Sequence, residues 1–202
     1  MANAHEAKPI AVGIAGGTAS GKTTLADRLA GALQPLSTQV LHMDRYFKPV
    51  RPQTQAPISG RSYEDHNHPD SFDLAALRQD LTGVLIPSDG STADVPAVVI
   101  VEGLMTLHDA VIRGHLDLKV FVDAQADERI VRRLRRNMDR GLAFDEIADF
   151  YLDSVRFRHQ EFVEPSRWHA DIVVNGSASG DKAVEVVASW VRRQHEERKA
   201  SC

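Results

Sequence analysis

The sequence predicts an α/β fold in three layers, with a mainly parallel sheet of about five strands between helices. Short apolar runs rich in β-branched residues recur at about 10–15, 38–43, 97–101, 118–122 and 171–174. Segments with a helical spacing of apolar residues lie between these runs, which is typical of parallel strands joined by crossover helices. In such a fold, ligands bind beyond the carboxyl ends of the strands.

A second observation concerns the turn between the first strand and the first helix. It follows the pattern G-x-x-x-x-G-K-[ST] in the strand–turn–helix context that this pattern requires. The backbone N–H groups of such a turn, together with the positive end of the helix dipole, bind phosphate oxygens. The residues expected to bind a nucleoside triphosphate are Gly16, Gly17, Thr18, Ala19, Ser20, Gly21, Lys22, Thr23 and Thr24. The alternative is a chance glycine-rich turn, whereas the full context predicts a P-loop NTPase fold.

Four polar residues at this edge of the sheet are candidates for phosphoryl-transfer chemistry. Lys22 supplies a cation for the β- and γ-phosphates, and the Thr23 hydroxyl is placed to ligate Mg²⁺. Glu102 ends an apolar strand and is expected to help hold Mg²⁺ through water. Asp44 follows another strand, where it could accept the proton of an attacking hydroxyl or reach Mg²⁺ through water. An Asp at such a position is also a common turn residue.

An arginine-rich helix is expected from about 126 to 140. At 100° per residue, one face carries Arg129, Arg132, Arg133, Arg136 and Arg140, and the opposite, core-facing side carries Ile130, Val131, Leu134 and Met138. A solvated charged face is the alternative. Like charges crowded on one stripe favour contacts with triphosphate or substrate from the C-terminal half of the helix, including Arg136 and Arg140.

The remaining segments complete a single domain spanning 1–202. Gly141 is expected to end the arginine-rich helix, and the region of about 136–160 is interpreted as a helical lid over phosphates. Asp73 is expected to cap the helix that follows it. The stretch 49–69 is expected to be a long loop. The ends, 1–8 and 196–202, are expected to be flexible.

Composition narrows the class of protein and its surroundings. The net charge is −4, whereas nucleic-acid binders usually carry a basic excess, so no nucleic-acid partner is expected. No apolar run approaches membrane-spanning length, and no membrane partner is expected. The single cysteine, Cys202, suits a reducing compartment, and we expect a cytoplasmic protein. The sequence is compatible with a homo-oligomer.

Several segments together resemble the uridine kinase group of P-loop kinases, which also includes phosphoribulokinases. The similar segments are Gly-Gly-Thr-Ala-Ser-Gly-Lys-Thr at 16–23, His-Pro-Asp-Ser-Phe-Asp at 68–73, Val-Glu-Gly at 101–103, Phe-Val-Asp-Ala-Gln-Ala-Asp at 121–127 and Phe-Val-Glu-Pro-Ser-Arg at 162–167. The similarity runs from about 10 to 176. It implies ATP- and Mg²⁺-dependent phosphorylation of a sugar hydroxyl on a small-molecule acceptor such as a nucleoside.

The resemblance also implies roles for individual residues. Asp44 matches the catalytic base of the group, in an Asp-Arg-Tyr-Phe setting that makes Tyr46 a candidate substrate contact. Thr23 and Glu102 match the positions of the Mg²⁺ site, with Asp44 nearby. Arg133 and Arg136 match arginines that contact substrate or phosphates. Asn67 and His68 are further candidates for substrate binding.

Some expected features of the group are missing. Uridine kinases carry a hairpin with a Tyr-Asp-aromatic sequence and a His that grip the pyrimidine, whereas the matching stretch 86–96 is short and has neither. Asn67 stands where the group has an Asp facing the ribose, and Leu142 stands in place of a lid arginine. The alternatives are therefore a phosphoribulokinase-like or nicotinamide riboside-type kinase, or a regulatory P-loop NTPase without a small-molecule acceptor.

Overall fold

The computed structural model of the chain describes residues 8–86, 95–178 and 180–201. Its centre is a five-stranded sheet in the order β2-β5-β1-β6-β7, in which every neighbouring pair is parallel. The strands are β1 (Ile10–Gly16), β2 (Thr38–His42), β5 (Val98–Glu102), β6 (Leu118–Asp123) and β7 (Ile172–Asn175). The expected three-layer α/β fold and its five strands are confirmed.

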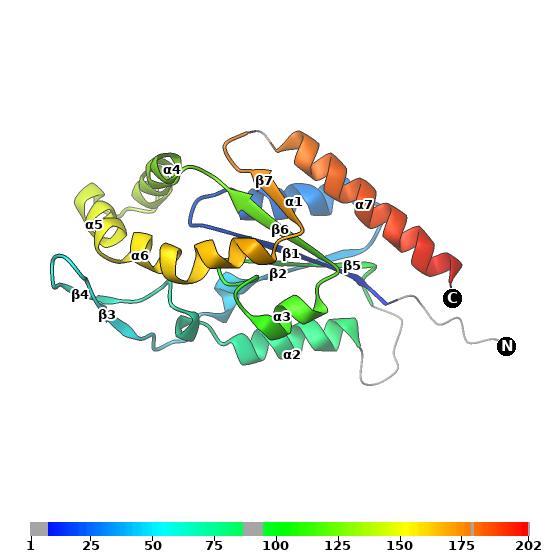
Figure 1. Cartoon of the computed structure of the whole chain (residues 1–202), viewed down its shortest axis with the longest axis horizontal. Coiled ribbons are helices and arrows are strands. Elements are labelled where there is room, and N and C mark those ends of the chain that lie inside the picture. Colours follow the sequence, from blue (N-terminus) through cyan, green and yellow to red (C-terminus); the bar gives the residue numbers. More distant parts are fainter. Residues whose placement is uncertain (1–7, 87–94, 179, 202) are drawn as a thin grey trace.

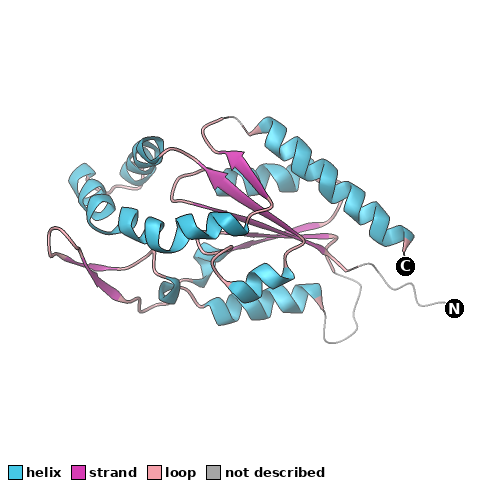
Figure 2. Cartoon of the chain, in the orientation of Figure 1, coloured by secondary structure: helices cyan, strands magenta, loops and turns pink. Residues whose placement is uncertain are grey.

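Helices cover both faces of the sheet (Figures 1 and 2). The helices α1 (Lys22–Ala32) and α7 (Asp181–Ala200) cover one face, and α2 (Leu74–Leu85) and α3 (Ala110–His115) cover the other. Successive side chains along β1 point to opposite faces of the sheet, so that Val12 packs with α1 and α7 while Ala11 packs with α2 and α3. Asp73 caps α2 by accepting a hydrogen bond from the backbone N–H of Ala76 at 3.0 Å, as the sequence predicts.

A small antiparallel hairpin occupies the stretch that was expected to be a long loop. Its strands are β3 (Gln53–Gln55) and β4 (Ser62–Glu64). Figure 1 shows it at one end of the molecule, below α4 (Ala126–Met138) and α5 (Phe144–Phe150). The expectation was wrong because strands this short, with almost no apolar residues, leave little periodicity to detect.

The helix α5 leads into a long, nearly continuous helical segment. It passes through the π-helical Tyr151–Val155, α6 (Arg156–Arg158), the π-helical His159–Val163 and the 3-10 helix Glu164–His169. The helix α4 ends at Met138, slightly earlier than expected, and Gly141, at a φ of 91°, lies in the turn that follows. Side chains of the segment bond to the hairpin: Asp153 accepts hydrogen bonds from Ser59 and Tyr63, at 2.6 and 2.8 Å.

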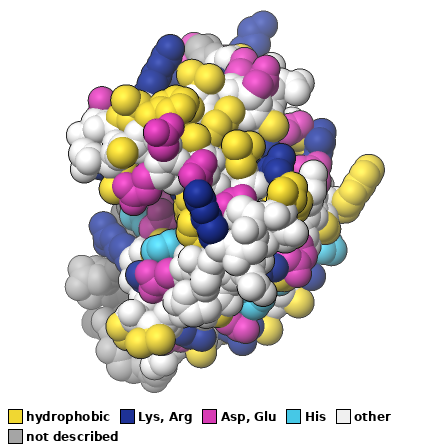
Figure 3. Space-filling model, turned by 90° about the vertical axis from the view of Figure 1, so that its left-hand side faces the viewer, with side chains coloured by type: hydrophobic (Ala, Val, Ile, Leu, Met, Phe, Trp, Pro, Cys, Tyr) yellow, Lys and Arg dark blue, Asp and Glu magenta, His cyan; other side chains and the backbone are white. Residues whose placement is uncertain are grey.

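The orientation of α4 reverses one expectation. Of the residues expected to face the core, Val131 and Met138 are 44% and 49% exposed and Ile130 and Leu134 are half-buried, whereas Arg129 is buried. The end of the molecule that carries α4 and α5 shows apolar side chains gathered at its upper part (Figure 3). The helical period separates an arginine face from an apolar face, but it does not tell which face turns inward. Here the arginine face points toward the P-loop.

The last helix extends into the tail that was expected to be flexible from Glu196. It continues to Ala200, and Arg198 donates hydrogen bonds to the carbonyl of Pro9 at 2.8 Å and to Asp117 at 2.6 Å. The stretch 87–94, which holds most of the segment compared with the pyrimidine-gripping hairpin, lies outside the described residues, as does 1–7. Within the described part of the chain, no helix is both long enough and apolar enough to cross a membrane.

Candidate active site

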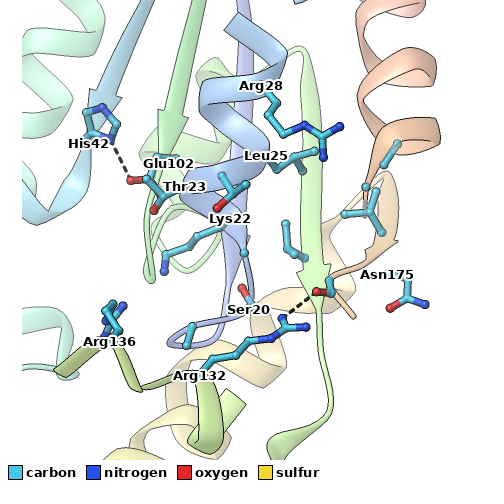
Figure 4. Close-up of a pocket in the computed structure, with 18 of the residues that line it drawn as sticks. Ser20, Lys22, Thr23, Leu25, Arg28, His42, Glu102, Arg132, Arg136 and Asn175 are labelled. Carbon is cyan, nitrogen blue, oxygen red and sulfur yellow. Dashed lines mark hydrogen bonds and ion pairs between the residues drawn. The ribbon is translucent and has the colours of Figure 1, made fainter. Parts of the chain in front are cut away.

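Two adjoining cavities open at the carboxyl ends of the central strands. The first, of about 780 Å³, runs along the P-loop toward the segment after β7, and Figure 4 shows side chains that line it. The second, of about 570 Å³, lies between the P-loop, α4, α5 and the hairpin. Four residues line both cavities: Lys22, Asp44, Arg136 and Arg140. These four side chains therefore form the boundary between a P-loop cavity and an outer cavity.

The P-loop has backbone geometry that only glycine adopts easily. Gly16 and Gly21 have φ angles of 153° and 101°. A Cβ at Gly16 would also lie 2.5 Å from the carbonyl oxygen of Val122. Gly21 directly precedes α1, so the amino end of this helix opens toward the P-loop cavity. The local sequence thus builds an anion-binding turn where the pattern predicts one.

Lys22 is surrounded by both acidic and basic side chains. Desolvation lowers the pKa of its ammonium, while the carboxylates of Glu102 and Asp44 act in the opposite direction. The guanidinium groups of Arg136 and Arg133 lower the pKa of Lys22 further. An anion placed between Lys22 and these arginines would relieve their mutual repulsion.

Thr23, Glu102 and His42 form a hydrogen-bonded chain across three elements. The Thr23 hydroxyl donates to Oε2 of Glu102 at 3.1 Å, and Nδ1 of His42 lies 2.9 Å from Oε1 of the same carboxylate. Sequence reasoning identified Thr23 and Glu102 but missed His42. His42 stands two positions before Asp44, and only its pairing with Glu102 across parallel strands could have singled it out.

The arginines of α4 contact the P-loop from the side. Arg133 donates from Nη1 to the Thr18 hydroxyl at 2.9 Å, and its burial, reinforced by Arg136, lowers its pKa to about 10. Desolvation and Arg140 lower the pKa of Arg136, and Asp44 opposes them. Arg129 is different, because it lies behind the loop: a Cβ at Gly17 would meet its Nη1 at 2.7 Å.

The outer cavity has an aromatic wall. The ring of Phe150, on α5, lies 5.3 Å from that of Tyr63 and 6.1 Å from that of His66, and the Arg133 guanidinium lies 5.8 Å from its centre. Further lining residues are Phe47, Asn67, Phe72, Leu104, Leu142, Glu146 and Ile147. Asn67 is buried, and its Nδ2 has no hydrogen-bond partner among the described residues. The cavity thus offers flat apolar surfaces and a free polar group.

Two residues expected to contact the substrate point elsewhere. The hydroxyl of Tyr46 donates to Asp80 on α2 at 2.7 Å, and Tyr46 lines neither cavity. His68 accepts a hydrogen bond from the backbone N–H of Asp70 at 3.1 Å, and its ring packs edge-on against Phe162. The geometry therefore does not bring Tyr46 or His68 into the outer cavity, whereas Tyr63 and His66, which were not among the candidates predicted from the sequence, line it beside Phe150.

The parallel sheet, the phosphate-binding turn before α1 and the acids that follow neighbouring strands define a kinase of the P-loop class. Two solved structures share the fold, at 19% and 21% identity. They are a candidate fructose transport system kinase from Silicibacter sp. TM1040, with a TM-score of 0.63 over 84% of this chain and 91% of the other, and a possible uridine kinase from Bacillus stearothermophilus, with a TM-score of 0.50 over 83% and 89%.

Sequence relatives place the chain more narrowly. It is 34% identical to the uridine kinase of Deinococcus deserti, over 92% of this chain and 96% of the relative, and 30% identical to that of Clostridium novyi, over 95% and 99%. The family model described as the phosphoribulokinase/uridine kinase family matches residues 84–183. The chain belongs to this family, and it is therefore an ATP-dependent phosphotransferase that acts on a hydroxyl group.

Proposed function

We propose that the chain transfers the γ-phosphate of Mg²⁺-ATP to a sugar hydroxyl of a nucleoside or a related small metabolite. One observation carries the proposal: Lys22, Asp44, Arg136 and Arg140 line both cavities, so a donor in one and an acceptor in the other would meet at a cationic boundary that contains a carboxylate. Phosphoryl transfer depends on alignment of the reactants and stabilisation of charge, and this boundary offers both.

The donor would occupy the P-loop cavity. Its phosphates would accept hydrogen bonds from the backbone of residues 16–24, and Lys22, Arg136 and Arg140 would balance the charge of the transferring group. Arg132, which lines the same cavity, donates to the carbonyl of Gly176 at 2.8 Å and so closes the side toward α7 (Figure 4).

The side chains near Thr23 fit a magnesium ion. Thr23 and Glu102 offer oxygen atoms, which Mg²⁺ prefers as ligands. No cluster of three or more His, Cys, Asp or Glu side chains suited to a metal occurs in the described ranges of the chain. This fits Mg²⁺, because at kinase sites one or two protein oxygens hold the ion together with phosphates and water. When bound, the ion would neutralise charge on the phosphates.

Asp44 is the proposed general base. It lies on the 3-10 turn after β2 and faces both cavities, where it could accept the proton of the attacking hydroxyl. The charges of Lys22 and Arg136 both interact with its carboxylate, so it lies among the cations that would balance the phosphates.

The acceptor would lie in the outer cavity. Its ring or apolar part would pack against Phe150, Tyr63 and His66, and the free Nδ2 of Asn67 would donate to one of its oxygens. Arg133 would contact the end of the acceptor that faces the phosphates of the donor. We also propose that the region 136–160 acts as a lid, because α5 and the end of α4 supply much of the wall of this cavity.

The experiment is a measurement of ADP release from Mg²⁺-ATP with a panel of acceptors: uridine, cytidine, nicotinamide riboside, ribulose 5-phosphate and pantothenate. Release with uridine or cytidine alone would identify a pyrimidine nucleoside kinase. Release with another member would keep the reaction and change the acceptor. Equal release in all tubes and in the blank without acceptor would contradict the proposal and favour a regulatory NTPase.

A further inference from the structure

His42 is a polar residue beside the P-loop that has no role in the reaction proposed above. It is the last residue of β2, and Glu102 is the last residue of β5. The two residues are register partners in a parallel pair, which brings their side chains to the same edge of the sheet. Figure 4 shows the imidazole reaching the carboxylate from the side opposite Lys22, with Nδ1 2.9 Å from Oε1.

The two oxygens of Glu102 have different partners. Oε1 faces His42, and Oε2 accepts the hydroxyl hydrogen of Thr23 at 3.1 Å. An ionised carboxylate can only accept hydrogen bonds, so Nδ1 of His42 has to carry the hydrogen. Since the Thr23 hydroxyl donates its hydrogen to Glu102, its oxygen lone pairs point away from the carboxylate. They remain available to a cation beside the phosphates.

The carboxylate that His42 contacts is buried. The side chain of Glu102 is 5% exposed, while that of His42 is 25% exposed and lines the P-loop cavity. A carboxylate this buried depends on its protein partners, since water has little access to replace them. Without His42, the carboxylate would be free to rotate about its last bond, and its contact with Thr23 would no longer be fixed.

We infer that His42 is a positioning residue for the magnesium site: its Nδ1–H fixes the Glu102 carboxylate, which in turn orients the Thr23 hydroxyl. This inference rests on the proposed function, because it takes Thr23 and Glu102 to be the protein groups that hold Mg²⁺. His42 itself does not touch the ion. Partners that orient metal ligands in this way typically change metal affinity by about 10- to 100-fold when they are removed.

The test measures Mn²⁺ binding by electron paramagnetic resonance, in the presence of an ATP analogue with an imido bridge between the β- and γ-phosphates. His42→Ala removes the donor and should weaken Mn²⁺ binding about tenfold. His42→Asn keeps an N–H at about the position of Nδ1 and should restore affinity to within about threefold, since it replaces the lost hydrogen bond. Affinity for the analogue in the presence of a chelator should be unchanged in both variants, because the P-loop is intact.

The inference would be overturned by wild-type Mn²⁺ binding in His42→Ala, or by equal losses in the Ala and Asn variants. A parallel loss of metal-free nucleotide binding would also overturn it, because it would indicate a general structural role. Glu102→Gln separates this inference from the proposed function. If Glu102→Gln weakens Mn²⁺ binding and His42→Ala does not, only the role inferred for His42 is refuted. If Glu102→Gln binds Mn²⁺ normally, the metal role proposed for Glu102 falls as well.

Discussion

Arg158 donates from Nε to the buried carboxylate of Asp65 at 2.7 Å, and from Nη2 to the hydroxyl of Thr54 at 3.0 Å. These bonds join the helical segment after α5 to β3 and to the residue that follows β4. Asp65 is 1% exposed at its side chain and also accepts a hydrogen bond from the backbone N–H of Asn67. One ion pair therefore connects the proposed lid to the segment that carries Asn67, whose amide is unpaired in the outer cavity.

Replacing Arg158 by Ala should destabilise the fold by about 3 kcal/mol, because it leaves the carboxylate of Asp65 buried without its cation. Urea unfolding would measure the free-energy difference. Arg61→Ala is a control, since Arg61 of the hairpin pairs with Asp149 on α5, and both of these side chains are largely exposed. Similar losses in the two variants would contradict a special role for the buried pair.

Asp44→Asn should lower turnover by about 100-fold or more, the scale expected for the loss of a general base, while ATP affinity stays nearly unchanged. Steady-state kinetics together with calorimetric ATP titration would separate the two effects. Asp80→Asn is the control, because Asp80 accepts a hydrogen bond from Tyr46 on the outside of both cavities. Unchanged turnover in Asp44→Asn would remove this residue from the proposed mechanism.

Phe150→Ala should raise the KM for the acceptor about tenfold and leave the KM for ATP within about twofold, since the ring belongs to the wall of the outer cavity alone. Tyr46→Phe should change neither constant by more than about twofold, as its hydroxyl bonds to Asp80. The reverse pattern, with a large effect at Tyr46, would support the substrate contact expected from the sequence.

His159 should make stability depend on pH. Desolvation and the nearby Arg129 lower the pKa of His159 from 6.5 to about 4, against the opposing effects of Glu164 and Asp123. Between pH 6.5 and about 4, the unfolded chain binds a proton that the folded chain does not, so the contribution of His159 to stability falls as the pH drops through this window. In His159→Gln, unfolding should lose part of this pH dependence. Parallel curves for the two proteins would refute the assignment.

Local sequence patterns predicted much of this molecule. The turn before α1 and the five main strands could be inferred because each is encoded within a few consecutive residues. His42 could not, since its significance arises from pairing with Glu102, 60 positions away. The face of α4 that turns toward the core could not be predicted either, because the helical period separates two faces without telling which of them is buried. Tyr63 and His66 lay in a stretch without strand periodicity, where the hairpin that places them was not detected.

The boundary of four shared side chains has a consequence for inhibition. A single molecule that joins an adenosine polyphosphate to an acceptor-like ring would place its phosphate chain across Lys22, Asp44, Arg136 and Arg140 and fill both cavities at once. Tethering two weak ligands in this way makes the second binding step intramolecular, so affinity can rise far beyond that of either half. The number of phosphates in the inhibitor that binds best would then indicate the distance between the donor and the acceptor across which the phosphoryl group is transferred.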